Sequence, residues 1–283
     1  MSGLLVPDDW DEGQDGFCVI GLTVPNSPYW RANIKGQVYQ LSSERMWDAE
    51  TGDAETAAAL AQTIYDSLEV VQCGLLANQA AYFPLSDVLD HIGDNDLTNV
   101  NGVSFVPGVV GNAASFSGSN HLQTNGLGIT GSLTIAAYIR SDSIAGSRHM
   151  IASKYNFGNA NQRAYRLAHE SADNTIQWIV SPNGSLNTST NQVFSNSAVP
   201  LDEWHHICAV FDGSAQELLI YIDGQFDVLK SVTYSTIYDS PAPFMIGATS
   251  QNNTPEQFFN GQIDELRVFE RALSEEEIAM LIA

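Results

Sequence analysis

The feature that most constrains this chain is a succession of short apolar segments, which begins near residue 85 and continues toward the C-terminus. Clusters of Gly, Asn and Ser separate these segments at intervals of about ten residues, a spacing typical of two packed β-sheets. Apolar side chains alternate within residues 133–139 and 206–211, so each predicted strand has an apolar face. Asp223 and Gly224 join two such segments and tolerate the positive φ angles of a tight hairpin. The pattern predicts an all-β fold.

The end of the chain has the signals of a last strand followed by a short helix. Residues 262–269 form the last alternating segment. Ser274 is followed three positions later by Glu277, the capping-box spacing found at the start of a helix. Ile278 then provides an apolar side chain with which this helix packs back onto the strands.

The N-terminal part of the chain has a different sequence pattern, which predicts a helix as well as strands. Its clearest element is a helix predicted over residues 54–71, for which Asp53 is a suitable N-cap. The helix has one apolar stripe, made of Ala57, Leu60, Ala61, Ile64 and Leu68. The stripe is buried either within its own region or against a partner chain, and a homo-oligomer is expected. We therefore divide the chain into a small α+β docking region, residues 1–83, and a two-sheet antiparallel jelly-roll sandwich, residues 84–283.

The charge of the chain argues against two classes of partner. Its 283 residues include 11 Lys and Arg against 33 Asp and Glu, a net charge of −22. Neither nucleic acid nor an anionic membrane surface is an expected partner, because both require basic side chains that neutralise phosphates. The sequence has no apolar run of the ~20 residues that a membrane-spanning helix needs. The N-terminus lacks the layout of a signal peptide, so the chain is expected to be made in a cytoplasm.

The cysteines predict neither a disulfide framework nor a metal site. They are three in number, widely spaced, and include no CxxC pair. Cys208 lies in an alternating apolar segment and is predicted to be a buried, unreactive thiol.

Several segments of the C-terminal part occur in an order that resembles a known family. They include Phe116, Gly118, Trp204-His205-His206, Tyr221-Ile222-Asp223-Gly224, Ile263-Asp264-Glu265-Leu266-Arg267-Val268 and residues 273–278. In this order they are similar to laminin G-like domains of the concanavalin A-like lectin/glucanase superfamily, over about residues 85–283. The resemblance implies a jelly roll of two antiparallel sheets, which binds rather than catalyses and often carries structural calcium.

The N-terminal region has a resemblance of its own. It rests on Tyr29-Trp30-Arg31, Gly36, Tyr39, Leu41, Trp47 and the Ala-rich segment after Asp53. These residues are similar to segments of minor structural proteins of tailed bacteriophages, which precede variable C-terminal modules. The resemblance implies a virion protein of the tail or capsid decoration, which contacts other virion proteins and displays a lectin-like domain to cell-surface glycans. A purely architectural virion protein and a bacterial glycan-binding protein are the alternatives.

Two polar loops of the predicted sandwich are candidates for glycan binding. They are residues 154–163 and 248–258, and both are rich in Asn and Gln. Amide side chains suit sugar hydroxyls because each provides donors and an acceptor, and an aromatic ring can stack on a sugar face. The candidate ligand-binding residues are Tyr155, Asn156, Asn161, Gln251 and Asn252. The alternative is that these are polar surface loops without a ligand.

Structural calcium is the cofactor hypothesis. Asp94 and Asp96 lie in a loop rich in oxygen ligands near the start of the predicted sandwich. Because the first strand of a jelly roll often lies beside the last, this loop is expected to approach Asp264. Carbonyl oxygens of the turn that ends at Gly118 can complete the six or more oxygen ligands that calcium takes. The alternative is that Asp94 and Asp96 only end a turn, while Asp264 is hydrogen-bonded locally.

The sequence predicts a protein that is not an enzyme. A retaining glycosidase needs two carboxyl groups about 5 Å apart, which on one strand requires acids at alternate positions. Asp264 and Glu265 are adjacent, so their side chains are expected on opposite faces of the strand. The same argument applies to His205 and His206, which cannot chelate one ion together. No catalytic residue is therefore predicted.

Overall fold

The computed structural model divides the chain into two compact units, Met1–Ala77 and Asn78–Ala283. The residues that it describes are 29–34, 37–42, 78–143, 148–187 and 191–282. In the first unit these residues form an antiparallel hairpin of β1 (Tyr29–Ile34) and β2 (Gln37–Ser42). The helix predicted over residues 54–71 lies outside the described residues.

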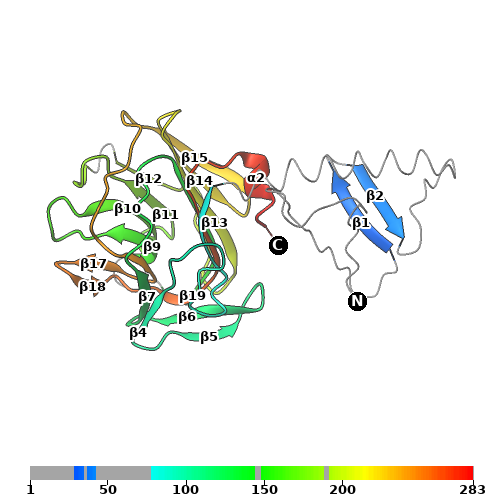
Figure 1. Ribbon diagram of the computed structural model, residues 1–283, viewed down its shortest axis with the longest axis horizontal. Coiled ribbons are helices and arrows are strands. Elements are labelled where there is room, and N and C mark those ends of the chain that lie inside the picture. Colours follow the sequence, from blue (N-terminus) through cyan, green and yellow to red (C-terminus); the bar gives the residue numbers. More distant parts are fainter. Residues whose placement is uncertain (1–28, 35–36, 43–77, 144–147, 188–190, 283) are drawn as a thin grey trace. The chain divides into compact units, whose positions relative to one another are not determined.

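The second unit is a sandwich of two antiparallel sheets, and the sheet that bears on function has seven strands (Figure 1). Its strand order is β12-β11-β10-β9-β16-β7-β4. These strands are β4 (Thr98–Val100), β7 (His121–Thr124), β9 (His149–Tyr155), β10 (Arg163–His169), β11 (Ile176–Val180), β12 (Gln192–Phe194) and β16 (Phe244–Ile246).

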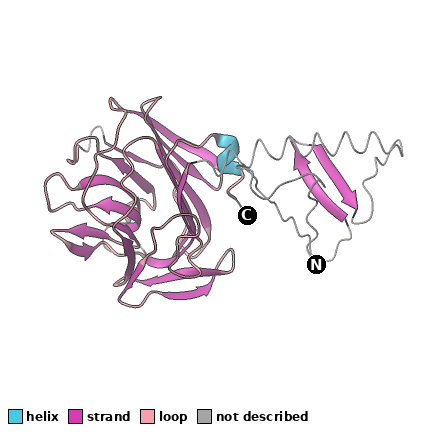
Figure 2. Ribbon diagram, viewed as in Figure 1, coloured by secondary structure: helices cyan, strands magenta, loops and turns pink. Residues whose placement is uncertain are grey.

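The second sheet has eight strands, in the order β15-β14-β13-β8-β19-β6-β5, with β3 also paired to β19. They are β3 (Gln79–Phe83), β5 (Ser104–Pro107), β6 (Asn112–Ser117), β8 (Leu133–Ser141), β13 (His205–Asp212), β14 (Glu217–Ile222), β15 (Gln225–Ser231) and β19 (Asn260–Phe269). The unit also contains a hairpin of β17 (Thr249–Gln251) and β18 (Thr254–Glu256), and the helix α2 (Glu275–Ala279). Strands dominate the described residues (Figure 2), which confirms the predicted two-sheet, all-β fold.

The second unit begins earlier than the predicted boundary between residues 83 and 84. Strand β3, which the prediction assigned to the N-terminal region, pairs with β19, with Phe83 opposite Leu266. Phe83 and Ala81 are buried in the core of the sandwich. The expectation that the first strand lies beside the last is thus confirmed, and residues 78–83 belong to the sandwich. They lacked a recognisable signal because a five-residue strand with two alanines has a weak apolar pattern.

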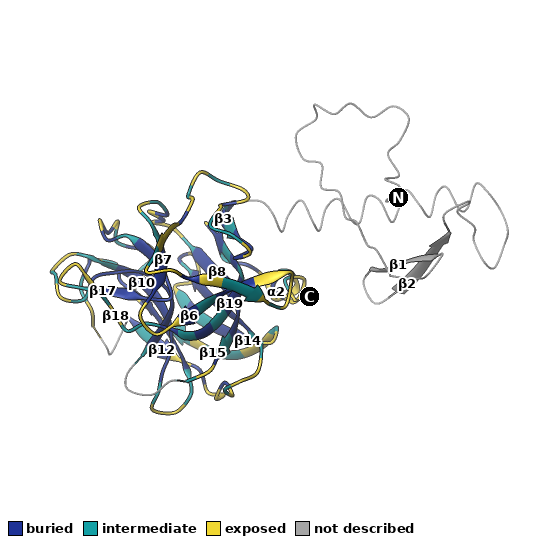
Figure 3. Cartoon of the chain, turned by 90° about the horizontal axis from the view of Figure 1, so that it is seen from below, coloured by how far each residue is buried: buried dark blue, intermediate teal, exposed yellow. Residues whose placement is uncertain are grey.

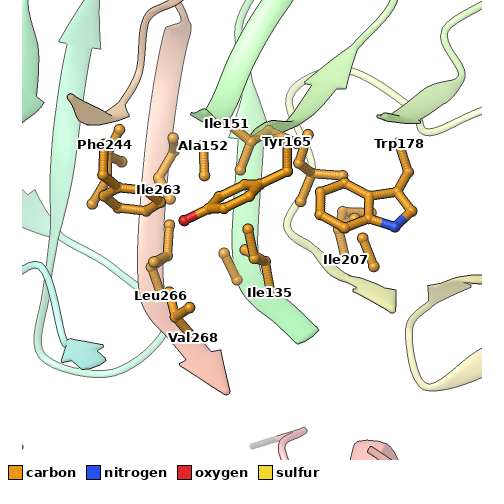
Figure 4. Packing of buried hydrophobic residues seen from close by; sticks show 14 of the residues in the cluster. Ile135, Ile151, Ala152, Tyr165, Trp178, Ile207, Phe244, Ile263, Leu266 and Val268 are labelled. Atoms are coloured by element: carbon orange, nitrogen blue, oxygen red, sulfur yellow. The ribbon is translucent and has the colours of Figure 1, made fainter. Parts of the chain in front are cut away.

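The core lies between the two sheets, as the distribution of buried residues shows (Figure 3). Tyr165, Trp178 and Phe244 extend from the seven-stranded sheet toward Ile135 and Ile263 of the other sheet (Figure 4). The alternation predicted for residues 133–139 is confirmed, because Leu133, Ile135, Ala137 and Ile139 all belong to the core. The Trp178 indole also ties the sheets together, since its Nε1–H donates to a carbonyl oxygen of β13 at 3.1 Å.

The predicted turn and helix cap are confirmed in detail. Asp223 and Gly224 have φ angles of 50° and 72°, and they connect β14 to β15. Ser274 accepts a hydrogen bond from the Glu277 N–H, and the Glu277 carboxylate accepts one from the Ser274 N–H, which completes a capping box. None of the described helices is long and apolar enough to cross a membrane.

Candidate functional site

Polar side chains occupy the outward face of the seven-stranded sheet, opposite the core. Successive residues of a strand alternate between faces, and directly paired residues share a face. Tyr165 and Trp178 point into the core, so Arg166 and Gln177 point outward. The same alternation places further side chains on the outward face: His121, Gln123, Ser153, Tyr155, Ile179, Gln192 and Met245. Most of them are buried, which means that loops cover part of this face.

The two candidate loops, residues 154–163 and 248–258, do meet. Asn156 forms a parallel bridge with Ser250, which continues the pairing between the loops beyond β9. The Asn156 amide also donates to the Asn253 side-chain oxygen at 2.8 Å. The amide groups therefore cross-link the loops into one platform, which the sequence predicted only as two separate segments.

Two of the predicted ligand-binding residues are part of this scaffold and do not contact solvent. Tyr155 is fully buried, so the prediction that its ring stacks on a sugar is wrong. Asn156 is buried as well, and its amide is occupied by Gln162 and Asn253. Both residues were assigned to an exposed loop, whereas Tyr155 ends β9 and Asn156 continues the pairing.

The other predicted residues lie at the surface of the platform. Asn161 and Asn252 are exposed and have φ angles of 56° and 52°, a conformation that Asn tolerates better than most residues. The Gln251 amide donates to the Glu256 carboxylate at 2.9 Å in the orientation that satisfies both groups. Exposed amides are therefore presented by two turns of the platform, one from each loop, which suits contact with sugar hydroxyls.

Arg166 is a buried charge on the outward face. It is 4% exposed, and its Nη2 donates to the Gln177 side-chain oxygen at 3.0 Å. Its guanidinium carbon lies 4.9 Å from the centroid of the Tyr155 ring, while its Nε has no acceptor. Burial lowers the pKa of this guanidinium from 12.5 to about 10.

Two further arginines surround Tyr155. Arg163 lies opposite Tyr155 in the pairing of β9 and β10, and its Nε has no acceptor. Arg148 forms an ion pair with Glu170, the one ion pair that the structure describes in this group. Burial raises the pKa of the Tyr155 hydroxyl, while the charges of the three arginines oppose this rise. Three positive charges thus act on Tyr155, and one of them is paired with a carboxylate, in a chain with a net charge of −22.

The carboxylate of Asp264 does not offer its oxygens to a cation. It is fully buried, and its Oδ2 accepts the Val109 and Val110 N–H groups at 2.7 and 3.0 Å. Its Oδ1 accepts the Glu265 N–H at 2.9 Å. The alternative that Asp264 is hydrogen-bonded locally holds only for the Glu265 N–H, because the other two donors are distant in sequence.

The remaining predicted calcium ligands lie elsewhere. The Asp96 carboxylate accepts the Asp90 N–H at 2.9 Å, Asp94 is exposed, and Gly118 pairs through its N–H with the Phe259 carbonyl at 3.0 Å. Within the described residues, no three His, Cys, Asp or Glu side chains form a group that could hold a metal ion. The residues that we predicted as ligands therefore do not fit a calcium site.

The important carboxylate of this region is Asp90, which the sequence analysis overlooked. It is 8% exposed and accepts the N–H groups of Tyr82, Ile92 and Asn95 at 3.0 to 3.2 Å. The Asn95 amide donates to it as well, at 2.9 Å. Asp90 therefore fastens the loop of residues 90–96 to β3. The four donors stabilise the negative charge of the carboxylate, as a cation would. No sequence motif predicts this arrangement.

The seven-stranded sheet has no carboxylate pair in its strands. None of its described strands contains an Asp or a Glu. On the other sheet, the Glu265 carboxylate accepts hydrogen bonds from the Tyr82 hydroxyl and from Arg267, both at 2.8 Å. The Asp223 carboxylate accepts the His205 Nδ1 and the His206 N–H, which holds the hairpin turn. These acidic and histidine side chains serve the fold.

The fold and this face define a lectin-like jelly-roll sandwich with a polar outward sheet. Residues 116–279 match the family model described as the concanavalin A-like lectin/glucanases superfamily. The match covers more than half of the chain, and the chain belongs to this family. A search of curated protein sequences finds no match.

Solved structures show the same fold. Domain 4 of AbnA, a GH43 extracellular arabinanase from Geobacillus stearothermophilus, in complex with arabinotriose, has a TM-score of 0.58 at 17% identity, over 73% of this chain and 98% of that domain. The binding domain of Paraclostridial Mosquitocidal Protein 1 has a TM-score of 0.57 at 17% identity, over 73% of this chain and 52% of that one. The binding domain of botulinum neurotoxin serotype G has a TM-score of 0.55 at 14% identity, over 72% of this chain and 50% of that one. The chain spans about half the length of the two toxin domains. At these identities the similarity shows the fold alone.

Proposed function

We propose that the sandwich is a non-catalytic carbohydrate-binding domain. The observation that carries this proposal is the loop platform beside the outward face, where exposed amides of Asn161 and Asn252 stand on an internally hydrogen-bonded scaffold. Such a rigid polar surface can bind sugar hydroxyls at a small cost in side-chain ordering. The arabinotriose complex of the similar arabinanase domain supports the same class of ligand.

The chemistry of the outward face supports binding rather than hydrolysis. Glycoside hydrolysis depends on two carboxyl groups that flank the scissile bond. The described strands of this sheet offer amide, guanidinium, imidazole and hydroxyl groups, and no Asp or Glu. A bound sugar would meet hydrogen-bond donors and acceptors there, without an acid and base pair from the strands.

We further propose that the chain is part of a tailed bacteriophage particle, in its tail or capsid decoration. The resemblance of residues 29–47 and of the Ala-rich segment after Asp53 to minor structural proteins of such phages supports this assignment. In this arrangement the N-terminal unit docks onto other virion proteins, as a homo-oligomer, and the sandwich is displayed to cell-surface glycans.

The test of carbohydrate binding is a glycan array probed with the full chain. We expect selective binding, which Asn252→Ala or Asn161→Ala weakens by roughly tenfold, the effect of one or two lost hydrogen bonds. The matched control is Asn112→Ala, which removes an exposed amide of β6 on the other sheet and should leave binding unchanged. An array without signal would overturn carbohydrate binding and favour the architectural role.

A further inference from the structure

On the outward face two buried side chains lie against each other, and each has a polar atom without a hydrogen-bonding partner among the described residues. The Arg166 guanidinium lies 4.9 Å from the Tyr155 ring centroid, and Arg166 is 4% exposed while Tyr155 is fully buried. Among the residues that the structure describes, neither the Nε of Arg166 nor the hydroxyl of Tyr155 has a hydrogen-bonding partner. Buried polar groups in folded proteins are nearly always hydrogen-bonded, so two orphaned donors at one place indicate a missing ligand.

The charge around these donors indicates the sign of that ligand. The charges of Arg148, Arg163 and Arg166 all act on the Tyr155 hydroxyl, and Glu170, which pairs with Arg148, is the one carboxylate among the described ion pairs of these arginines. A buried charge without a counter-charge is unfavourable, and an anion that enters the group removes this cost. A neutral sugar alone cannot do so.

The orientation of Arg166 suits an oxyanion. On one side its Nη2 donates to the Gln177 oxygen, and the Gln177 amide in turn donates to Gln192 at 3.1 Å. This chain of amides holds the guanidinium in one orientation and leaves its Nε edge for a ligand. Guanidinium groups bind carboxylate and sulfate oxygens through two parallel N–H donors.

We propose that this site binds an acidic sugar, whose carboxylate or sulfate group accepts hydrogen bonds from Arg166 and from the Tyr155 hydroxyl. The inference rests on the proposed carbohydrate binding and specifies its chemical class. The side chains of Arg148 and Arg163 are partly exposed, and that of Arg148 is 37% exposed. In this proposal the anion reaches Arg166 and Tyr155 after neighbouring side chains change rotamer, a change that is common at binding surfaces.

The experiment compares three sets of glycans on the full chain, by array and by isothermal titration. One set ends in carboxylated sugars, the second in sulfated sugars, and the third in neutral sugars of the same linkage. We expect the carboxylated or the sulfated set to bind more tightly than the neutral set, and the difference between these two sets identifies the source of the anion.

Two variants assign the binding to these side chains. Arg166→Gln should weaken binding of the acidic glycan by roughly 30-fold or more, the usual effect of removing one partner of a buried charge pair. Tyr155→Phe should weaken it by roughly tenfold and leave the melting temperature unchanged, because the hydroxyl has no partner to lose within the protein. If Arg166→Gln does not fold, Tyr155→Phe alone decides the question.

The matched control is Tyr165→Phe. The Tyr165 hydroxyl donates to the Leu127 carbonyl at 2.9 Å inside the core, so its removal should lower stability without changing the affinity for the acidic glycan. Binding of neutral glycans only, or acidic binding that both variants leave unchanged, overturns this inference while carbohydrate binding stands. Absence of binding to all three sets overturns both.

Discussion

The loop that Asp90 fastens to β3 provides the sharpest test of the structural reasoning. Its Oδ1 accepts the Tyr82 and Ile92 N–H groups, and its Oδ2 accepts the Asn95 N–H and side-chain amide. In Asp90→Asn one oxygen becomes an NH2 group, so two of the four donors lose their acceptor in either orientation. A hydrogen bond to a charged group contributes about 1.5–3 kcal/mol, and the neutral amide recovers part of the desolvation cost. We therefore expect a loss of about 2–4 kcal/mol in the free energy of unfolding.

The pH dependence of this loss follows from the pKa of Asp90. Burial raises the pKa, but the N–H groups of Gly93, Tyr82 and the other donors outweigh it, and the pKa lies below its ordinary value of 3.8. A carboxylate with a lowered pKa stabilises the fold above its unfolded pKa, and this stabilisation is lost as the pH falls through the folded value. The difference between wild type and variant should therefore be full at neutral pH and shrink below about pH 4.

Urea unfolding followed by tryptophan fluorescence measures both effects. The matched control is Asp87→Asn, three residues before Asp90, where the carboxylate is 45% exposed, accepts one backbone N–H and lies 3.5 Å from the exposed His91 ring. This control should change the free energy of unfolding by less than about 0.5 kcal/mol. A loss below about 1 kcal/mol for Asp90→Asn, or a loss that persists at acid pH, would refute the reasoning.

Four further predictions concern the rest of the sandwich. Millimolar calcium or a chelator should leave the melting temperature unchanged, because the Asp264 oxygens already accept backbone N–H groups; a calcium-dependent rise would contradict this. Gly247→Ala should cost about 2 kcal/mol or more in urea unfolding, because Gly247 has a φ of 81° and an added Cβ would lie 2.4 Å from the Phe116 ring. Ser274→Ala should cost about 1 kcal/mol in the same assay through loss of the helix cap. Burial raises the pKa of the Cys208 thiol, so mass spectrometry should detect its alkylation only after unfolding.

Local signals in the sequence were sufficient for much of the sandwich. The Asp223-Gly224 turn and the Ser274 cap are set by residues within a few positions, and both were predicted correctly. Strand alternation likewise identified the core face of β8, because the period of two follows from the backbone geometry of a strand. The predicted division after residue 83 left β3 outside the sandwich. The position of this short strand depends on its pairing with β19, which is distant in sequence.

The candidate site was predicted less well, because its contacts join residues that are distant in sequence. The loops were identified correctly as polar segments, but the sequence could not reveal that Asn156 pairs with Ser250 and becomes buried. Asp264 was assigned to calcium because the first strand of a jelly roll often lies beside the last, and no sequence pattern indicates which groups donate to its carboxylate. Its actual donors at Val109 and Val110 lie about 155 residues earlier in the chain.

The sequence by itself determined the class of fold, the hairpin, the helix cap and the apolar side of each strong strand, because these depend on periodicity and on the chemistry of adjacent residues. Only the tertiary structure decided which polar side chains share the outward face. The register between β9, β10 and β11 brings Tyr155, Arg166 and Gln177 together, and a shift of one residue would send these side chains to the core face. Strand register is a property of paired strands, so no single segment of the sequence contains the site.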